Sequence, residues 1–224
     1  MLTWCPQLLK KLKYGGGKKK KAYRTCIDWL LGVSMAKRLN SSYLVKIWRT
    51  GGFIVNTNMQ EGKQYYSQSG HGTCVFGKRE TLQAMHFDEE IWLQDTRYAL
   101  PDDMVMFYKL HLMGARIAVN RSVRFVHLDA GSSLASEEKK LANMYASARN
   151  GFVFWHRFIY KCQDKKWLSV ACVLRRMFFT LFFAFLKSLA KWNWRYVSTY
   201  AKAYADAFRF VRSERYKELP ARLA

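Results

Sequence analysis

The chain has 224 residues, of which 50% are hydrophobic and 16% aromatic, so a sizeable folded core is expected and global disorder is excluded. Lysine and arginine number 38 against 16 acidic residues, which gives a formal net charge of +22. Such a charge predicts a polyanionic partner, but its sign does not choose among nucleic acid, an anionic membrane surface and phosphorylated substrates.

The first 24 residues are basic and interrupted by glycines at positions 15–17. No hydrophobic strand precedes these glycines and the Walker spacing is absent, so a solvated loop is favoured over a phosphate-binding loop. This segment also lacks the apolar core of a signal peptide. The five cysteines are odd in number and lack short metal-ligand spacings, which favours a reducing compartment. A cytoplasmic protein is therefore expected.

Short elements are expected up to residue 100. Hydrophobic spacing and turn residues predict a helix over residues 25–39, a turn at 40–42, strands at 51–57 and 74–78, a helix at 81–85 and a loop that starts at 87. Within this stretch His71 lies between two glycines. The glycines allow the backbone to approach a ligand closely, but they equally suit a simple turn.

Two adjacent carboxylates, Asp102 and Asp103, follow a proline and precede an apolar run that predicts a helix ending at Gly114. Asp102 is the predicted N-cap and Asp103 falls in the first turn, where the helix dipole favours anions. On local grounds helix capping is the simpler explanation for the pair. A general base is the alternative, because the helix would orient the carboxylate beside a loop-lined cleft.

Two strands are predicted after Gly114, over residues 115–119 and 122–128, with His127 at the end of the second. A single histidine at a strand end is more often a hydrogen-bonded residue than a ligand. Ser136 then predicts the N-cap of a helix that runs to residues 150–151, ahead of a second aromatic segment at 151–160.

The C-terminal part is aromatic and basic. Residues 167–194 contain apolar runs flanked by tryptophans, but the Arg175–Arg176 pair argues against a simple membrane span, which needs about 20 mostly apolar residues. The pattern favours a helix lying in the membrane interface, and a buried core helix is the alternative. One more basic amphipathic helix is predicted from residue 196, ending before Leu219.

The order of four motifs, SGHGTCVFGKRETL, FDEEIW, YALPDDMVMFYKLHLMGARIAV and VRFVHLDAGSS, resembles the C-terminal half of bacterial family 2 glycosyltransferases. The resemblance covers roughly residues 50–155. It implies an α/β chain: a partial GT-A nucleotide-sugar-binding domain followed by a helical, membrane-associating C-terminal region. The implied segments are a basic remnant at 1–49, the catalytic half at 50–135 and the membrane-association region at 136–224.

By resemblance, Asp103 is the catalytic base of an inverting sugar transfer and Asp102 is the supporting acid. His71 and Gly72 match the segment that lines the donor and acceptor cleft. His127 matches a late histidine that helps to hold the metal or the diphosphate in some relatives. The implied partners are a nucleotide-sugar donor, a glycan or lipid-linked acceptor and the anionic inner face of the cell membrane, with no nucleic acid.

One departure concerns the cofactor. The family binds Mg²⁺ or Mn²⁺ through an Asp-x-Asp motif, and no Asp-x-Asp occurs in this sequence. The chain is therefore expected to begin after that motif and to be inactive or incomplete alone. Two rival functions stay open: a non-enzymatic, membrane-associated basic interaction protein, and a basic nucleic-acid binder, which would show steeply salt-dependent binding.

Overall fold

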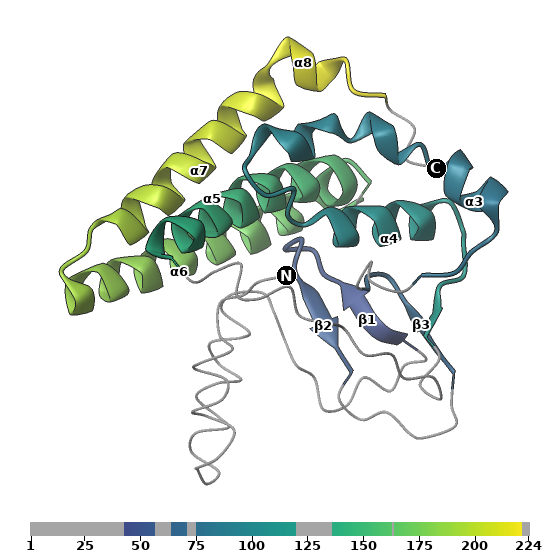
Figure 1. The fold of residues 1–224 in the computed structure, drawn as a ribbon, viewed down its shortest axis with the longest axis horizontal. Coiled ribbons are helices and arrows are strands. Elements are labelled where there is room, and N and C mark those ends of the chain that lie inside the picture. The colour runs from purple at the N-terminus through teal and green to yellow at the C-terminus, as the bar shows by residue number, and fades with distance from the viewer. Residues whose placement is uncertain (1–42, 57–63, 71–74, 120–135, 163, 221–224) are drawn as a thin grey trace, which may run out of the picture.

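The computed structural model describes residues 43–56, 64–70, 75–119, 136–162 and 164–220. A small sheet and helix α4 lie on one side of the molecule, and long helices form the other side (Figure 1). The mixed α/β content expected from the sequence is confirmed at this level.

The sheet has four short strands in the order β2-β1-β3-β4. Their bounds are β1 Tyr43–Ile47, β2 Phe53–Val55, β3 Tyr65–Ser67 and β4 Ala118–Val119. β1 pairs with β2 antiparallel and with β3 parallel, and β3 pairs with β4 antiparallel. Gly51 closes the β1–β2 turn with a φ of 69°, and a Cβ there would lie 2.9 Å from Cβ of Trp155. A glycine is therefore required both by the backbone and by the contact with the helical side.

Short helices connect the sheet to α4. They are α3 Arg79–Ala84, the 3-10 helices η1 Phe87–Glu89 and η2 Ile91–Asp95, and α4 Asp102–Leu112. At the end of α4, Gly114 has a φ of 82° and its N–H donates to the carbonyl of His111 at 3.0 Å. This is the left-handed glycine stop predicted from the sequence.

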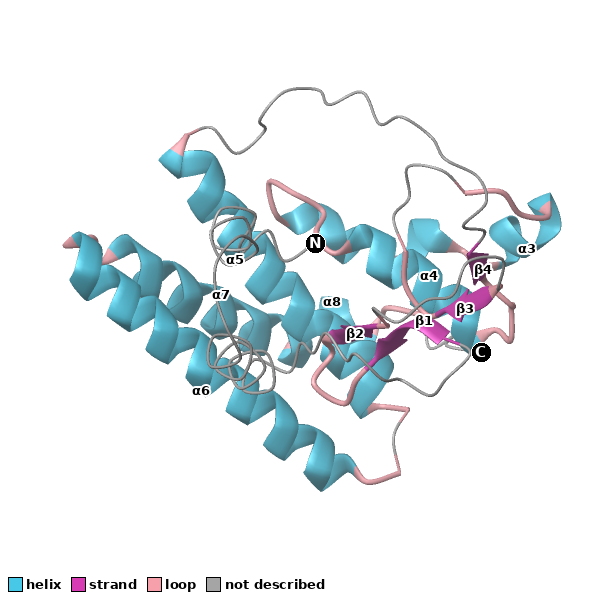
Figure 2. Ribbon diagram, turned by 90° about the horizontal axis from the view of Figure 1, so that it is seen from below, coloured by secondary structure: helices cyan, strands magenta, loops and turns pink. Residues whose placement is uncertain are grey.

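The helical side consists of α5 Glu137–Phe154, a π-helical continuation η3 Trp155–Tyr160, α6 Lys166–Lys191, α7 Arg195–Arg212 and α8 Glu214–Lys217. α7 packs along both α5 and α6, as Figure 2 also shows. The interface is closed by small and aromatic side chains such as Ala184, Ala203, Ala207 and Tyr200. Small residues let helix backbones approach closely, so these helices form one packed layer.

Most expected helices are confirmed, but α5 and the basic tail differ from the prediction in where their helices end. Ser136 caps α5, its hydroxyl accepting from the N–H of Lys139 at 3.2 Å. The helix does not stop at 150–151 but continues through Tyr160, because Phe152, Phe154, Trp155 and Phe158 after Gly151 are buried in the core. The basic tail forms α7 and α8, separated at Ser213.

The strand predictions are less accurate. β2 confirms the strand at 51–57, and β4 confirms the strand at 115–119 in its last two residues. The strand at 74–78 is wrong for residues 75–78, which form a loop with Phe76 exposed. β1 and β3 were not predicted, and β3 lies where a polar loop was expected between the strands at 51–57 and 74–78. The helix expected at 25–39 and the strand at 122–128 lie outside the described residues.

Candidate functional site

Asp102 and Asp103 are both inside the first turn of α4, after an N-cap at Pro101. The N–H of Val105 donates to the carbonyl of Pro101 at 3.0 Å, and the N–H of Asp102 donates to that of Ala99 at 2.9 Å. No side chain caps the helix. The prediction that Asp102 is the N-cap is therefore wrong, because Pro101 takes that position and moves both carboxylates into the first turn.

The two carboxylates differ from the acids that precede them in the chain. Glu89, Glu90 and Asp95 each form ion pairs. Neither Asp102 nor Asp103 forms a hydrogen bond through its side chain, or an ion pair, with the part of the chain that the structure describes. Both side chains are half-buried. The helix start thus holds two accessible acidic groups whose lone pairs are not used by the described residues.

The loop before α4 is anchored by the buried carboxylate of Glu90. Arg157 of η3 binds it in a bidentate manner, with Nε to Oε2 and Nη2 to Oε1 both at 2.9 Å. Lys109 of α4 donates to Oε1 at 3.0 Å, and Trp92 Nε1 donates to Oε2 at 2.6 Å. One carboxylate therefore joins the loop, α4 and the helical side of the molecule.

The charges at this anchor compensate one another. Burial alone would raise the pKa of Glu90, but the hydrogen bonds and charge of Arg157, with donation from Trp92 and Lys109, outweigh it and hold that pKa below its ordinary value. Lys109 and Arg157 are as deeply buried as Glu90. Removal of one partner from a buried pair typically costs about 3–5 kcal/mol, because the remaining charge is left uncompensated.

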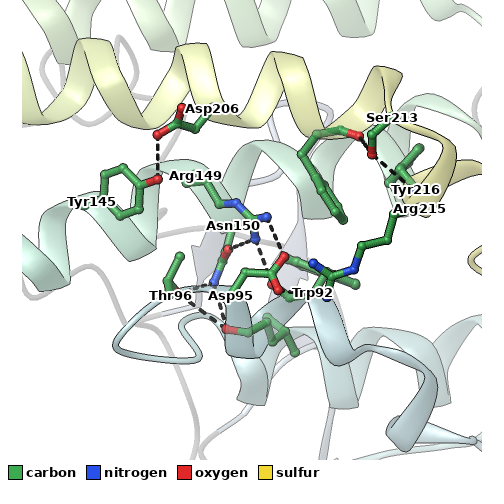
Figure 3. A network of polar contacts seen from close by, with 12 residues as sticks. Trp92, Asp95, Thr96, Tyr145, Arg149, Asn150, Asp206, Ser213, Arg215 and Tyr216 are labelled. Atoms are coloured by element: carbon green, nitrogen blue, oxygen red, sulfur yellow. Dashed lines mark hydrogen bonds and ion pairs between the residues drawn. The ribbon is translucent and has the colours of Figure 1, made fainter.

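A second anchor comes from Arg149 and Asn150 of α5 (Figure 3). Arg149 donates to the carbonyl of Trp92 at 2.7 Å and to Asp95 Oδ2 at 2.8 Å. Asn150 Nδ2 donates to Thr96 Oγ1 at 3.0 Å, and that hydroxyl donates to the carbonyl of Tyr98 at 2.6 Å. These bonds hold residues 92–98, so the segment that leads to the Asp pair is fixed from the helical side.

One face of α4 contacts the chain segment that follows β3. Gln68 contacts His111, and a Cβ on Gly70 would lie 2.9 Å from the Phe107 ring. Asp103, Phe107 and His111 are spaced by four residues, so they share one helix face. The chain from Gln68 to Gly70 therefore passes along α4 toward its N-terminus, which is the end that carries Asp103.

The Gln68–His111 contact fixes the histidine tautomer. Gln68 Oε1 accepts from the N–H of Ile47 at 2.7 Å, which orients the amide and leaves its NH₂ facing His111 Nε2 at 2.7 Å. Nε2 must then accept, so the imidazole is neutral with its proton on Nδ1. Burial, followed by the charge of Lys46, lowers the pKa of His111, in agreement with the neutral ring.

Three predicted site residues, His71, Gly72 and His127, lie outside the described residues. Within the described ranges no group of three or more His, Cys, Asp or Glu side chains could hold a metal ion. The Asp102–Asp103 pair with its described surroundings therefore does not fit a complete Mg²⁺ or Mn²⁺ site, which needs six oxygen ligands from protein, substrate or water.

Sequence patterns predict a role for the Asp pair but none for the two anchors. Glu90 lies within the FDEEIW motif, and Arg149 and Asn150 lie near the predicted end of a helix. A signal did exist, since Arg149 and Asn150 directly precede a long aromatic run in which unpaired polar groups would be costly. Their partners are 54 to 57 residues away in sequence, so spacing alone does not identify them.

Comparison of the chain with known protein families, with curated protein sequences and with solved structures gave no match.

Proposed function

We propose that this chain carries the acceptor-side machinery of an inverting glycosyltransferase of the family 2, GT-A type. It would transfer a sugar from a nucleotide-sugar donor to a glycan or lipid-linked acceptor. The observation that carries the proposal is the Asp102–Asp103 pair at the start of α4, which forms no ion pair or side-chain hydrogen bond with the described residues, in a region where the preceding loop acids are paired.

In this proposal Asp103 is the general base. Its carboxylate takes the proton of an acceptor hydroxyl while that oxygen attacks the anomeric carbon from the side opposite the leaving group. The bond from the anomeric carbon to the diphosphate oxygen breaks, and the nucleoside diphosphate leaves with both bonding electrons. A positioned base typically contributes 10²–10⁴-fold to such a rate. Asp102 is the supporting acid beside it.

Pre-organisation of the loop supports the assignment. A catalytic carboxylate must be held close to its productive geometry by surrounding contacts. The Glu90 anchor fixes the loop to Lys109 of α4, and the Arg149–Asn150 anchor fixes the segment that ends three residues before Pro101. Both anchors help to hold the Asp pair in position. A pair that only stabilised the start of α4 would not need either anchor.

The path of the chain at Gly70 supports the predicted binding segment. Gly70 lies against Phe107, one helical turn after Asp103 on the same face of α4, and is joined covalently to His71. His71 and Gly72 lie outside the described residues, and their role in lining the donor and acceptor cleft stays an expectation from the resemblance. A divalent metal and the donor diphosphate remain expectations from the resemblance, and no step of the proposed chemistry is derived through them.

Asp103→Asn tests the proposal in membranes of the source organism, where any second chain that supplies the nucleotide-binding half is present. Transfer from a radiolabelled nucleotide-sugar is expected to fall by at least about 100-fold. Asp88→Asn is the matched control, because Asp88 is an exposed acid of the same region, and it should leave transfer unchanged. Equal transfer by wild type and Asp103→Asn would overturn the proposal.

The non-enzymatic alternative is a membrane-associated interaction protein, and the exposed apolar face of α6 favours it as the second candidate. It predicts that Asp103→Asn has no effect on any activity of the membranes. The same variant therefore separates the two functions, because the charge is removed without changing the shape of the side chain.

A further inference from the structure

Between Trp167 and Leu189 every exposed side chain of α6 is apolar. These side chains recur every three or four residues, which places them in one stripe: Trp167, Ala171, Leu174, Phe178, Phe182, Phe185, Leu186 and Leu189. Trp167 is 72% exposed and Phe178 62%. Surface helices normally direct charged and polar side chains to water, so this outer stripe has the reverse polarity of a soluble surface helix.

The inner face of α6 carries the polar groups instead. Ser169 Oγ donates to the carbonyl of Arg49 at 3.1 Å and also accepts from Trp155 Nε1 at 3.1 Å. Arg176 donates to the carbonyl of Thr50 at 2.9 Å. Burial lowers the pKa of Arg176. The helix is thus tied to the β1–β2 turn by hydrogen bonds, and its most apolar residues face outward.

The C-terminal end of the outer stripe meets a basic groove. Trp194 packs against Phe185, with ring centroids 6.0 Å apart, and Trp192 beside it is 89% exposed. The next residue, Arg195, lines a groove of about 320 Å³ together with Arg97, Lys202, Tyr145 and Glu138. Glu138 pairs with Arg195 at 2.6 Å, which leaves two further cations in the groove. Exposed tryptophans therefore stand directly beside positive charge.

We propose that the outer stripe of α6 docks onto an anionic lipid bilayer with the helix lying parallel to the membrane plane. The phenylalanines and leucines enter the acyl-chain boundary, and the tryptophans at both ends lie at the headgroup level. The groove around Arg195 receives lipid phosphates. This charge complementarity, supported by the net charge of +22, selects an anionic bilayer over a second copy of this equally basic chain.

The inner contacts of α6 exclude a spanning orientation of the folded chain. By length and composition α6 is the one helix of the described residues that could cross a membrane, with a mean hydropathy of 1.7. A spanning helix would expose every face to lipid unless other apolar helices covered it. Here the inner face is covered by the basic helix α7 and by the β1–β2 turn, so a span would carry these polar elements into hydrocarbon.

Flotation of the full chain with vesicles tests the docking. Vesicles of equal parts phosphatidylglycerol and phosphatidylcholine should bind the protein at least about tenfold more tightly than pure phosphatidylcholine. F178S/F182S/F185S should lose at least about tenfold of this affinity, because three apolar anchors of the outer stripe are removed. Phe76→Ser is the matched control, since Phe76 is 93% exposed but lies outside α6, and it should bind as wild type does.

Three outcomes would overturn the proposal. The first is wild-type binding that F178S/F182S/F185S leaves unchanged, with circular dichroism showing both proteins folded. The second is absence of vesicle binding together with a wild-type dimer that the same variant converts into a monomer in light scattering, which assigns the outer stripe to a second copy. The third is protection of Arg209 and Arg212 from external trypsin when the chain is synthesised beside sealed vesicles. An in-plane helix leaves both arginines open to trypsin, whereas a spanning helix that translocates α7 protects them.

Discussion

The loop before α4 and helix α6 both reverse the usual rule that charge lies outside and apolar side chains inside. The loop buries the charges of Glu90, Lys109 and Arg157, and each finds a partner within the molecule. α6 exposes its phenylalanines, and the described residues do not cover them. Paired buried charges position the loop, whereas the Asp102–Asp103 pair and the outer stripe are neither paired nor covered by the described residues, which leaves both available to partners.

The largest expected effect comes from breaking the Glu90 anchor. Glu90→Gln removes the anionic partner of the buried Arg157 and leaves Lys109 only the longer pair with Glu89 at 3.4 Å, so the free energy of unfolding should fall by about 3–5 kcal/mol in urea titrations. Asp88→Asn removes an exposed acid two residues away and should change it by less than about 0.5 kcal/mol. A cost for Glu90→Gln as small as that of Asp88→Asn would contradict the role of the anchor.

Acid should destabilise the molecule through its half-buried histidines. Burial, followed by the charge of Lys161, lowers the pKa of His156 from 6.5 to about 4. The unfolded chain therefore takes up a proton at a higher pH than the folded chain, so stability is complete above about pH 6.5 and falls as the pH drops toward 4. Because the ring is only half-buried, this histidine is expected to contribute a loss on the order of 1–3 kcal/mol at pH 4.

Thermal unfolding between pH 7 and pH 4 measures this effect, and His156→Gln should flatten the curve. His111 acts in the same direction because its pKa is also lowered. A stability that stays level across this range in the wild type would show that the pKa of neither histidine is lowered in the folded chain.

A smaller effect is expected at the contact between Gly70 and α4. In Gly70→Ala the new Cβ would lie 2.9 Å from the Phe107 ring, so the segment after β3 must move, at a cost of about 1–3 kcal/mol. Phe107→Leu in the same chain should relieve the clash. A chemical denaturation series of the single and double variants measures the coupling, and strictly additive costs would contradict the contact.

The smallest effect is expected on the outer stripe of α6. Phe178→Ser changes a side chain that is 62% exposed, so the free energy of unfolding in solution should change by less than about 1 kcal/mol. The same measurement used for Glu90→Gln provides the comparison. A loss above about 2 kcal/mol would mean that Phe178 packs against protein, and that the outer stripe is part of the core.

Sequence periodicity predicted α4, α5 and the basic tail, because caps such as Ser136 and Gly114 and long amphipathic spacing are local signals. It failed for β1 and for residues 75–78, because strands of three to five residues carry too few positions to show an alternation. The cap at Pro101 was missed since Asp is the usual N-cap residue. The Glu90 and Arg149 anchors depend on pairing across more than 50 residues, which a single sequence does not encode locally.

We propose that Asp103 serves chemistry and is not needed to hold the fold. Sugar transfer and the free energy of unfolding should therefore be measured on the same Asp103→Asn substitution, in membranes of the source organism and in the purified chain. Transfer reduced by at least about 100-fold with unfolding changed by less than about 1 kcal/mol is the predicted result. Sugar transfer that persists, or that falls only in proportion to the loss of folded protein, would contradict the role of Asp103 as the general base.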